Sequence, residues 1–318
     1  MPIDVLCAGL IVADHVCAPI AQFPPAGGLV TTDRLELTTG GCAANVAVDL
    51  AKLGLRASIA GRIGNDVLGR FVTETLSSQG VDCSTISISE TAQTSGTLVV
   101  NVAGEDRRFL HAVGANAEFT GLEIPESVLR GCRAIYVGGF GLNPALSGAN
   151  VARLFRAARA AGVVTVLDVV VGQPDRLPPM LVDALPETDL FLPNTDEARL
   201  ICSESDPLRQ ARHFRDLGAR SVIVTLGGDG LLLVSDTDRL VAQAYPVRAV
   251  DGTGGGDAFV SGYLYGLLRP ADACQRLAYG SAMGMSCVRA MGATTGVFSA
   301  NELERFVAEH PLSVRNID

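Results

Sequence analysis

The sequence predicts an α/β protein with a mostly parallel sheet covered by helices and a small separate β-sheet that forms a lid. Short apolar runs alternate along the chain with segments whose apolar residues recur at helical spacing. Two stretches, about 17–39 and 94–112, interrupt this alternation with strand-like sequence and no helix. No repeat or long linker marks a second independent unit, so we expect residues 1–318 to form a single domain.

The alternation of strands and helices can be followed from the N-terminus. We expect strands of the main sheet at 5–10, 57–60, 134–137, 163–167, 190–192 and 222–226, followed by a hairpin at 231–234 and 240–244. The expected helices are at 43–53, 67–78 and 148–161, before Gly218, and in three segments after the hairpin. Such an alternation is typical of parallel strands joined by crossover helices.

The two interrupting stretches predict the lid. The second contains a turn at Gly104-Glu105-Asp106, as expected between paired strands. Non-adjacent excursions of this kind can pair into a small sheet over one edge of the α/β domain. Because the edges of such a sheet have unpaired strands, we predict a homodimer formed through the lid.

Composition argues against several classes of protein. Every apolar run is interrupted before the roughly 18–20 residues of a membrane-spanning helix, as where 163–167 stops at Asp168. Asp4 stands where a secretory signal would be basic, so we expect a cytoplasmic protein. The net charge of −9 opposes nucleic-acid binding. The eight cysteines lack CxxC spacing and are expected to be reduced core residues.

Lys52 is the only lysine in the chain, and its position argues against several enzyme classes. A Walker A loop requires Gly-Lys-Ser/Thr, whereas Lys52 lies between Ala51 and Leu53 in an expected helix. A pyridoxal Schiff base or a protein-kinase site would need the same lysine in another context. Phosphate binding in this chain therefore has to rely on other groups.

Glycine is over-represented, with 35 of 318 residues, and one dense cluster is Asp251-Gly252-Thr253-Gly254-Gly255-Gly256-Asp257. An apolar helical pattern follows directly, so this loop leads into a helix N-terminus. Its amides and the helix dipole suit a phosphate. Asp257 could accept the proton of an attacking hydroxyl while the Gly254 to Gly256 amides stabilise the transferring phosphoryl group. The alternative is a flexible turn in which Asp257 only caps the helix.

Six ordered motifs resemble those of the ribokinase-like (PfkB) carbohydrate kinases. Residues 251–257 resemble the family's DTxGAGD signature, and Gly40-Gly41-Cys42-Ala43-Ala44-Asn45 resembles its N-terminal signature. Residues 61–69 are similar to its G-x-x-G-x-D-x-x-G motif and 113–116 to its lid-return segment. Asn194-Thr195-Asp196-Glu197 resembles its NxxE motif and 225–230 its TLGxxG nucleotide loop. The resemblance covers essentially the whole chain.

The resemblance implies a ribokinase-like three-layer α/β sandwich with a β lid. It also implies transfer of the γ-phosphoryl group from ATP and Mg²⁺ to a hydroxyl of a sugar, a sugar-like molecule or a nucleoside. By this match Asp257 is the general base, and the anion hole is formed by Gly254, Gly255 and Gly256. The residues implied to hold the sugar hydroxyls are Asp14, Gly40, Gly41 and Asn45. Without the match, Asp14 would be a solvated carboxylate at a strand end.

The resemblance also implies a nucleotide site and metal sites. Near the nucleotide it places Asn194, Thr225, Gly227 and Gly230, and it has Glu197 order a magnesium-bound water. Asn194 and Glu197 also have the spacing of a helix capping box, and 225–230 has the composition of a tight turn. A monovalent-cation site, which would take K⁺, is implied for Asp251 and Thr253 with carbonyls around Gly292.

The chain departs from the family pattern at several positions. Gly252 and Gly255 replace a common threonine and alanine, so we expect the loop to tighten only when phosphate binds. The strand at 136–140 lacks the carboxylate that ribokinases place near the sugar, which argues against ribose. Arg107, Arg108 and His111 could meet a charged substrate or form a solvated lid face.

Two other functions are alternatives to the kinase. One is a non-catalytic sugar or nucleotide sensor on the same fold, which the intact Asp257 and its glycines disfavour. The other is an NAD-dependent oxidoreductase, which is disfavoured because a GxGxxG motif read from Gly252 would need glycine at position 257.

Overall fold

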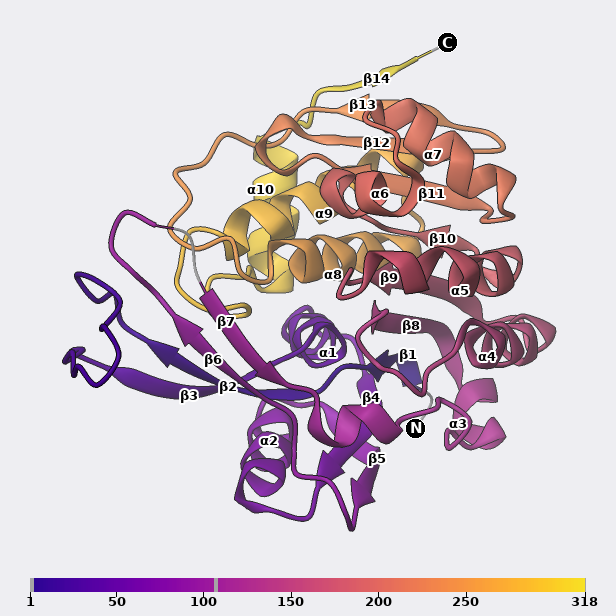
Figure 1. The fold of residues 1–318 in the computed structure, drawn as a ribbon. Coiled ribbons are helices and arrows are strands. Elements are labelled where there is room, and N and C mark those ends of the chain that lie inside the picture. The colour runs from indigo at the N-terminus through magenta and orange to yellow at the C-terminus, as the bar shows by residue number, and fades with distance from the viewer. Residues whose placement is uncertain (1–2, 106–107, 318) are drawn as a thin grey trace.

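A ten-stranded sheet runs through the centre of the molecule (Figure 1). The computed structural model describes residues 3–105 and 108–317. Neighbouring strands pair in parallel from β5 to β11, and β11 to β14 pair antiparallel. In sheet order the strands are β14 (Val314–Asn316), β13 (Arg239–Ala242), β12 (Leu231–Ser235), β11 (Ser221–Thr225), β10 (Leu190–Phe191), β9 (Val164–Val169), β8 (Cys132–Phe140), β1 (Ile3–Gly9), β4 (Ala57–Gly64) and β5 (Asp82–Ser89).

Helices cover both faces of the sheet, so the predicted three-layer α/β class is confirmed (Figure 1). One face packs on α1 (Cys42–Lys52), α2 (Val67–Ser78), α8 (Gly255–Leu267), α9 (Ala273–Cys287) and α10 (Ala300–Glu309). The other packs on α3 (Glu126–Arg130), α4 (Gly148–Ala160), α5 (Leu177–Ala184), α6 (Thr195–Cys202) and α7 (Pro207–Asp216). Short 3-10 turns are η1 (Gly114–Glu118), η2 (Pro174–Arg176), η3 (Leu185–Glu187) and η4 (Gly227–Asp229).

The central strand β1 shows why its sequence is continuously apolar. Val5 and Cys7 pack into the cluster on the α1 and α8 face, whereas Leu6 and Ala8 pack into the cluster on the α4 face. Because successive side chains of a strand point to opposite faces, a parallel strand with helices on both sides buries every residue.

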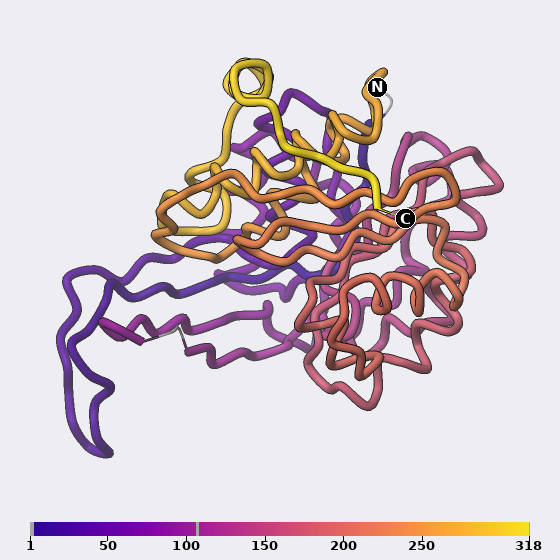
Figure 2. Tube along the Cα trace, turned by 90° about the horizontal axis from the view of Figure 1, so that it is seen from above, coloured from indigo at the N-terminus to yellow at the C-terminus, as the bar shows by residue number. Residues whose placement is uncertain are grey.

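The lid is a separate four-stranded sheet that projects from one side of the body (Figure 2). Its strands, in order, are β3 (Leu35–Gly40), β2 (Val12–Cys17), β6 (Gly96–Val100) and β7 (Arg108–Ala112). β2 and β6 pair in parallel, and the outer pairs are antiparallel. The lid therefore begins at Val12 rather than near residue 17. Only Leu10 and Ile11 separate it from β1, whose last residue, Gly9, has φ +131°.

Some elements differ from the prediction. The exposed edge strand β5 and the three-residue β14 were not expected, because both have few buried apolar residues. The chain consequently ends in a strand after its last helices. No described helix is long and apolar enough to cross a membrane. All eight cysteines are free thiols, and Cys274 is exposed rather than in the core.

Candidate active site

The glycine-rich loop places Asp257 in the first turn of α8. Gly254, immediately before the helix, has φ +77°, and a Cβ there would lie 2.4 Å from the Ala293 carbonyl oxygen. Only glycine can therefore occupy this position. The first amides of a helix have no carbonyl partner within it, so the start of α8 presents donors and a carboxylate together. The Gly255 amide already donates a 3.4 Å hydrogen bond to Gly252.

The Asp257 carboxylate is held by α1, which is far away in sequence. Asn45 Nδ2 donates a 2.8 Å hydrogen bond to Asp257 Oδ2. Burial raises the pKa of Asp257 from 3.8 to about 6, while hydrogen bonds from Asn45 and Cys42 oppose the rise. A carboxylate with this pKa is mostly ionised at pH 7 and is basic enough to take up a proton.

A cavity of about 140 Å³ brings residues of three motifs together. It lies where β9, β10 and β11 end, which is where open α/β sheets bind ligands. The sequence-predicted residues that line it are Asn194, Glu197, Thr225, Gly254, Gly256 and Asp257. The NxxE motif, the start of the nucleotide loop and the loop before α8 therefore meet at one site.

Asn194 and Glu197 form the capping box that their spacing predicts. Asn194 Oδ1 accepts hydrogen bonds from the Asp196 and Glu197 amides, and Glu197 Oε2 accepts one from the Asn194 amide. Burial raises the pKa of Glu197 to about 7, and the charge of Asp257 adds to the rise. Capping and a position in the cavity are thus compatible for the same side chain.

Two polar residues that line this cavity, Asp168 and Cys42, are not among the predicted site residues. Asp168 lies near the end of β9 and accepts a 3.1 Å hydrogen bond from the Tyr136 hydroxyl. One ligand atom each of Asp168, Cys42 and Asp257 lie within 4.8 Å of one another. Burial raises the pKa of Asp168, and the charges of Glu197 and Asp257 raise it further. The sequence feature that could have identified Asp168 is its position, because it is a carboxylate directly after the apolar run of an expected parallel strand.

The residues expected to hold a sugar lie next to this cavity rather than in its lining. Asp14 is on lid strand β2, not at the end of the first strand of the main sheet. Its Oδ1 is buried and has no hydrogen-bond partner among the described residues. Burial raises the pKa of Asp14, while a hydrogen bond from Thr97 and the charge of His15 oppose the rise. A Cβ on Gly40 would lie 1.9 Å from Asp14 Oδ2. Gly41, with φ +93°, is the N-cap residue of α1, which carries Asn45.

The remaining predicted residues lie outside the cavity lining. Gly227 and Gly230 form the turn between β11 and β12, both with positive φ. Asp251 accepts hydrogen bonds from the Thr253 amide and hydroxyl at 2.9 and 2.6 Å, and from the Gly292 amide at 2.9 Å. The residues implied for a monovalent cation therefore lie close together. The hydrogen bonds to the Asp251 carboxylate hold this loop in place.

The basic lid residues are engaged with the lid itself. Arg108 forms an ion pair with Glu105 and lies over the Phe23 ring, 5.8 Å from its centroid. His111 Nδ1 is 3.0 Å from the Thr97 hydroxyl oxygen. Arg107 lies outside the described residues.

Comparison with known proteins identifies the family. Residues 3–300 match the family model described as pfkB family carbohydrate kinase. The chain belongs to the pfkB family of carbohydrate kinases. The family that the sequence motifs predicted is thereby confirmed, and so is assignment to the kinases rather than to a nicotinamide-dependent enzyme.

Individual pfkB relatives extend over most of the chain. It is 29% identical over 287 residues to aminoimidazole riboside kinase of Salmonella typhimurium, covering 86% of this chain and 89% of the relative. It is 26% identical over 308 residues to ribokinase of Haemophilus influenzae, covering 95% and 97%. A crystal structure of a putative ribokinase II from E. coli in complex with ATP and Mg²⁺ superposes with a TM-score of 0.82 at 25% identity, covering 97% of this chain and 100% of the other.

Proposed function

We propose that this pfkB-family kinase transfers the γ-phosphoryl group of MgATP to a hydroxyl of a sugar, sugar-like molecule or nucleoside, with Asp257 as general base. The observation that carries the proposal is the position of Asp257. It lies at the N-terminus of α8, hydrogen-bonded to Asn45, in the cavity that also holds the NxxE motif. A phosphate-binding helix terminus and a base of suitable pKa therefore share one site.

In the proposed step the acceptor hydroxyl oxygen attacks the γ-phosphorus. Its proton passes to an Asp257 carboxylate oxygen, the new P–O bond forms, and the bond to the β-phosphate oxygen breaks to release ADP. The amides of Gly254, Gly255 and Gly256 stabilise the charge on the transferring group. Gly256 lines the cavity, whereas Gly255 must release its weak bond to Gly252 to take part.

Glu197 and Asp168 suit the magnesium ion that accompanies ATP. Magnesium prefers oxygen ligands, and the charges of Glu197 and Asp257 raise the pKa of Asp168 while the charge of Asp257 raises the pKa of Glu197. A divalent cation would offset this repulsion between carboxylates. We assign Glu197 to a magnesium-bound water and Asp168 to the same metal. When bound, the metal neutralises charge on the phosphates.

The acceptor would be held by Asp14, Gly40, Gly41 and Asn45. The buried, unpartnered Asp14 Oδ1 suits a sugar hydroxyl donor, and the space beside Gly40 leaves room for Asp14. The names of the relatives point to ribosides and sugars as acceptors. Asn194, Thr225, Gly227 and Gly230 would contact the nucleotide, and Asp251 and Thr253 would frame a K⁺ site. We further place the enzyme in the cytoplasm.

A homodimer through the lid stays part of the proposal. The lid edges are β3 and β7, and large apolar side chains on the lid strands are exposed, including Leu35 (60%), Leu98 (39%) and Leu110 (63%). Unpaired edges with apolar side chains favour a partner. Sedimentation at micromolar concentration should show a dimer, and a monomer would contradict it.

The test of the proposed function is ATP consumption with a panel of sugars and nucleosides. At least one acceptor should give ADP and a phosphorylated product in equal amounts. Asp257→Asn should lower kcat by about 10²- to 10⁴-fold while an ATP analogue still binds. Unchanged turnover in this variant would refute the role of Asp257. ATP binding without consumption across the panel would instead support a sensor.

A further inference from the structure

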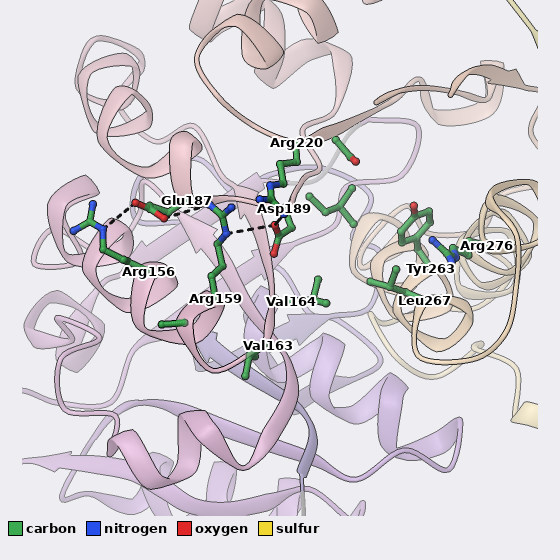
Figure 3. A pocket seen from close by; sticks show the side chains of 14 residues that line it. Arg156, Arg159, Val163, Val164, Glu187, Asp189, Arg220, Tyr263, Leu267 and Arg276 are labelled. Carbon is green, nitrogen blue, oxygen red and sulfur yellow. Dashed lines mark hydrogen bonds and ion pairs between the residues drawn. The ribbon is translucent and has the colours of Figure 1, made fainter. Parts of the chain in front are cut away.

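A second cavity, of about 790 Å³, lies at the opposite end of the sheet from Asp257. Figure 3 shows the side chains that line it. It opens where β9, β10 and β11 begin, whereas the candidate active site lies where these strands end. Helix α8 spans both places. Its first turn carries Asp257, and Tyr263 and Leu267 further along it line the second cavity. The two cavities share no lining residue, although α8 contributes residues to both.

One wall of the second cavity is a chain of ion pairs (Figure 3). Arg156 Nε is 2.9 Å from Glu187, and Arg159 is 3.2 Å from the other oxygen of Glu187. Asp189 lies 3.6 Å from Arg159 and 3.4 Å from Arg220. Three guanidinium groups thus share two carboxylates, so this wall carries one positive charge in excess. It presents both hydrogen-bond donors and acceptors to the cavity.

The opposite wall carries Arg276 of α9 and Tyr263 of α8 (Figure 3). Arg276 Nε donates a 2.9 Å hydrogen bond to the Ala271 carbonyl, which fixes the side chain. Among the described residues, no carboxylate forms an ion pair with Arg276. Burial raises the pKa of Tyr263, and the Arg276 guanidinium opposes that rise, which shows that the two groups face each other. The charge of Asp238 adds to the rise, so a carboxylate acts on this wall as well. Within the described residues this wall therefore offers a guanidinium without an ion pair beside a hydroxyl.

We propose that this cavity is a binding site for a sugar phosphate or related phosphorylated polyol, separate from the catalytic centre. The phosphate is held by Arg276 and the Tyr263 hydroxyl, because an unpaired guanidinium is the strongest anion-binding group of the cavity. The hydroxyl groups of the molecule meet the carboxylates and guanidinium groups of the other wall. The volume lies within the roughly 300–1,000 Å³ of small-molecule sites, and Val163 and Leu267 provide apolar contact.

The proposal can be tested by binding alone, without reference to kinase activity. Glucose 6-phosphate, glucose and inorganic phosphate are titrated calorimetrically into the full chain, with the ATP analogue AMP-PNP and Mg²⁺ present throughout. The variants are Arg276→Gln and Arg220→Gln, one on each wall. Arg153→Gln is the matched control, because Arg153 is an exposed residue of α4 that does not line the cavity.

We expect one glucose 6-phosphate per chain, bound more tightly than glucose or inorganic phosphate. Arg276→Gln should weaken binding by about tenfold or more, and Arg153→Gln should leave it unchanged. If Arg276→Gln does not fold, a loss of binding in Arg220→Gln carries the same conclusion. Equal affinity in the wild type and both cavity variants would place the molecule elsewhere and overturn the proposal. Binding of inorganic phosphate as tight as that of glucose 6-phosphate would overturn the sugar phosphate class, and no binding would overturn the site.

Discussion

Replacing Asp257 with Asn should stabilise the ligand-free protein while it removes the proposed catalytic base. Burial raises the pKa of Asp257 from 3.8 to about 6, so the folded state disfavours the ionised carboxylate. A difference of about 2 pKa units corresponds to about 3 kcal/mol of folding free energy that is lost once the pH exceeds 6. Asparagine has no charge to bury, and its side-chain oxygen can still accept the hydrogen bond from Asn45. For a chain of this length the gain corresponds to about 4 °C in Tm.

The pH dependence distinguishes this cause from a general packing effect. Because the raised pKa belongs to an acid, the native state binds the proton more tightly, and wild-type stability falls as the pH rises from about 4 to 6. The Tm advantage of Asp257→Asn should be full at pH 8 and about half as large at pH 5. Thermal unfolding of both proteins without ligands measures it, with Asp183→Asn, an exposed residue of α5, as the control. A Tm advantage that is absent at pH 8 or independent of pH would refute the reasoning.

Three further predictions concern Gly40, Asp49 and Glu197. Gly40→Ala adds a Cβ that would lie only 1.9 Å from Asp14 Oδ2, so the Asp14 side chain has to move. The KM for the acceptor, measured by steady-state kinetics, should therefore rise about 10- to 100-fold. An unchanged KM would exclude Asp14 from acceptor binding. Asp49 is fully buried in α1, and neither of its carboxylate oxygens is hydrogen-bonded among the described residues. Asp49→Ala should therefore raise the free energy of unfolding, measured in urea, by about 1–3 kcal/mol. A loss of stability would contradict this prediction. Glu197→Gln keeps the capping geometry but removes the negative charge. The Mg²⁺ concentration needed for half-maximal activity should rise about tenfold. An unchanged Mg²⁺ dependence would show that Glu197 takes no part in metal binding.

Much of the candidate site could be predicted because its motifs are local in sequence. The loop from Asp251 to Asp257 needs only consecutive glycines and a following helix to present amides and a carboxylate together. The capping box of Asn194 and Glu197 likewise depends on a spacing of three residues. Motifs of this kind are set by backbone geometry over a few residues, so the sequence is sufficient to place them on their elements.

Asp168 could not be placed in the site from the sequence, because its partners come from other strands and helices. Tyr136, on β8, fixes it, and the charges of Glu197 and Asp257 act on it across the cavity. The same is true of Asp14, whose position depends on where β1 gives way to the lid. Between these elements only Leu10 and Ile11 intervene, and both are buried.

The sequence by itself determined the α/β class, the family resemblance and the loop that carries Asp257, because periodicity and turn chemistry are properties of neighbouring residues. Only the tertiary structure decided which carboxylates share the cavity and therefore how strongly their pKa values rise, since burial and charge interactions depend on distances between remote segments. The arginine-lined cavity belongs to the second kind as well. Its walls come from α4, the starts of β9 to β11, α8 and α9, which the parallel sheet brings together at one edge.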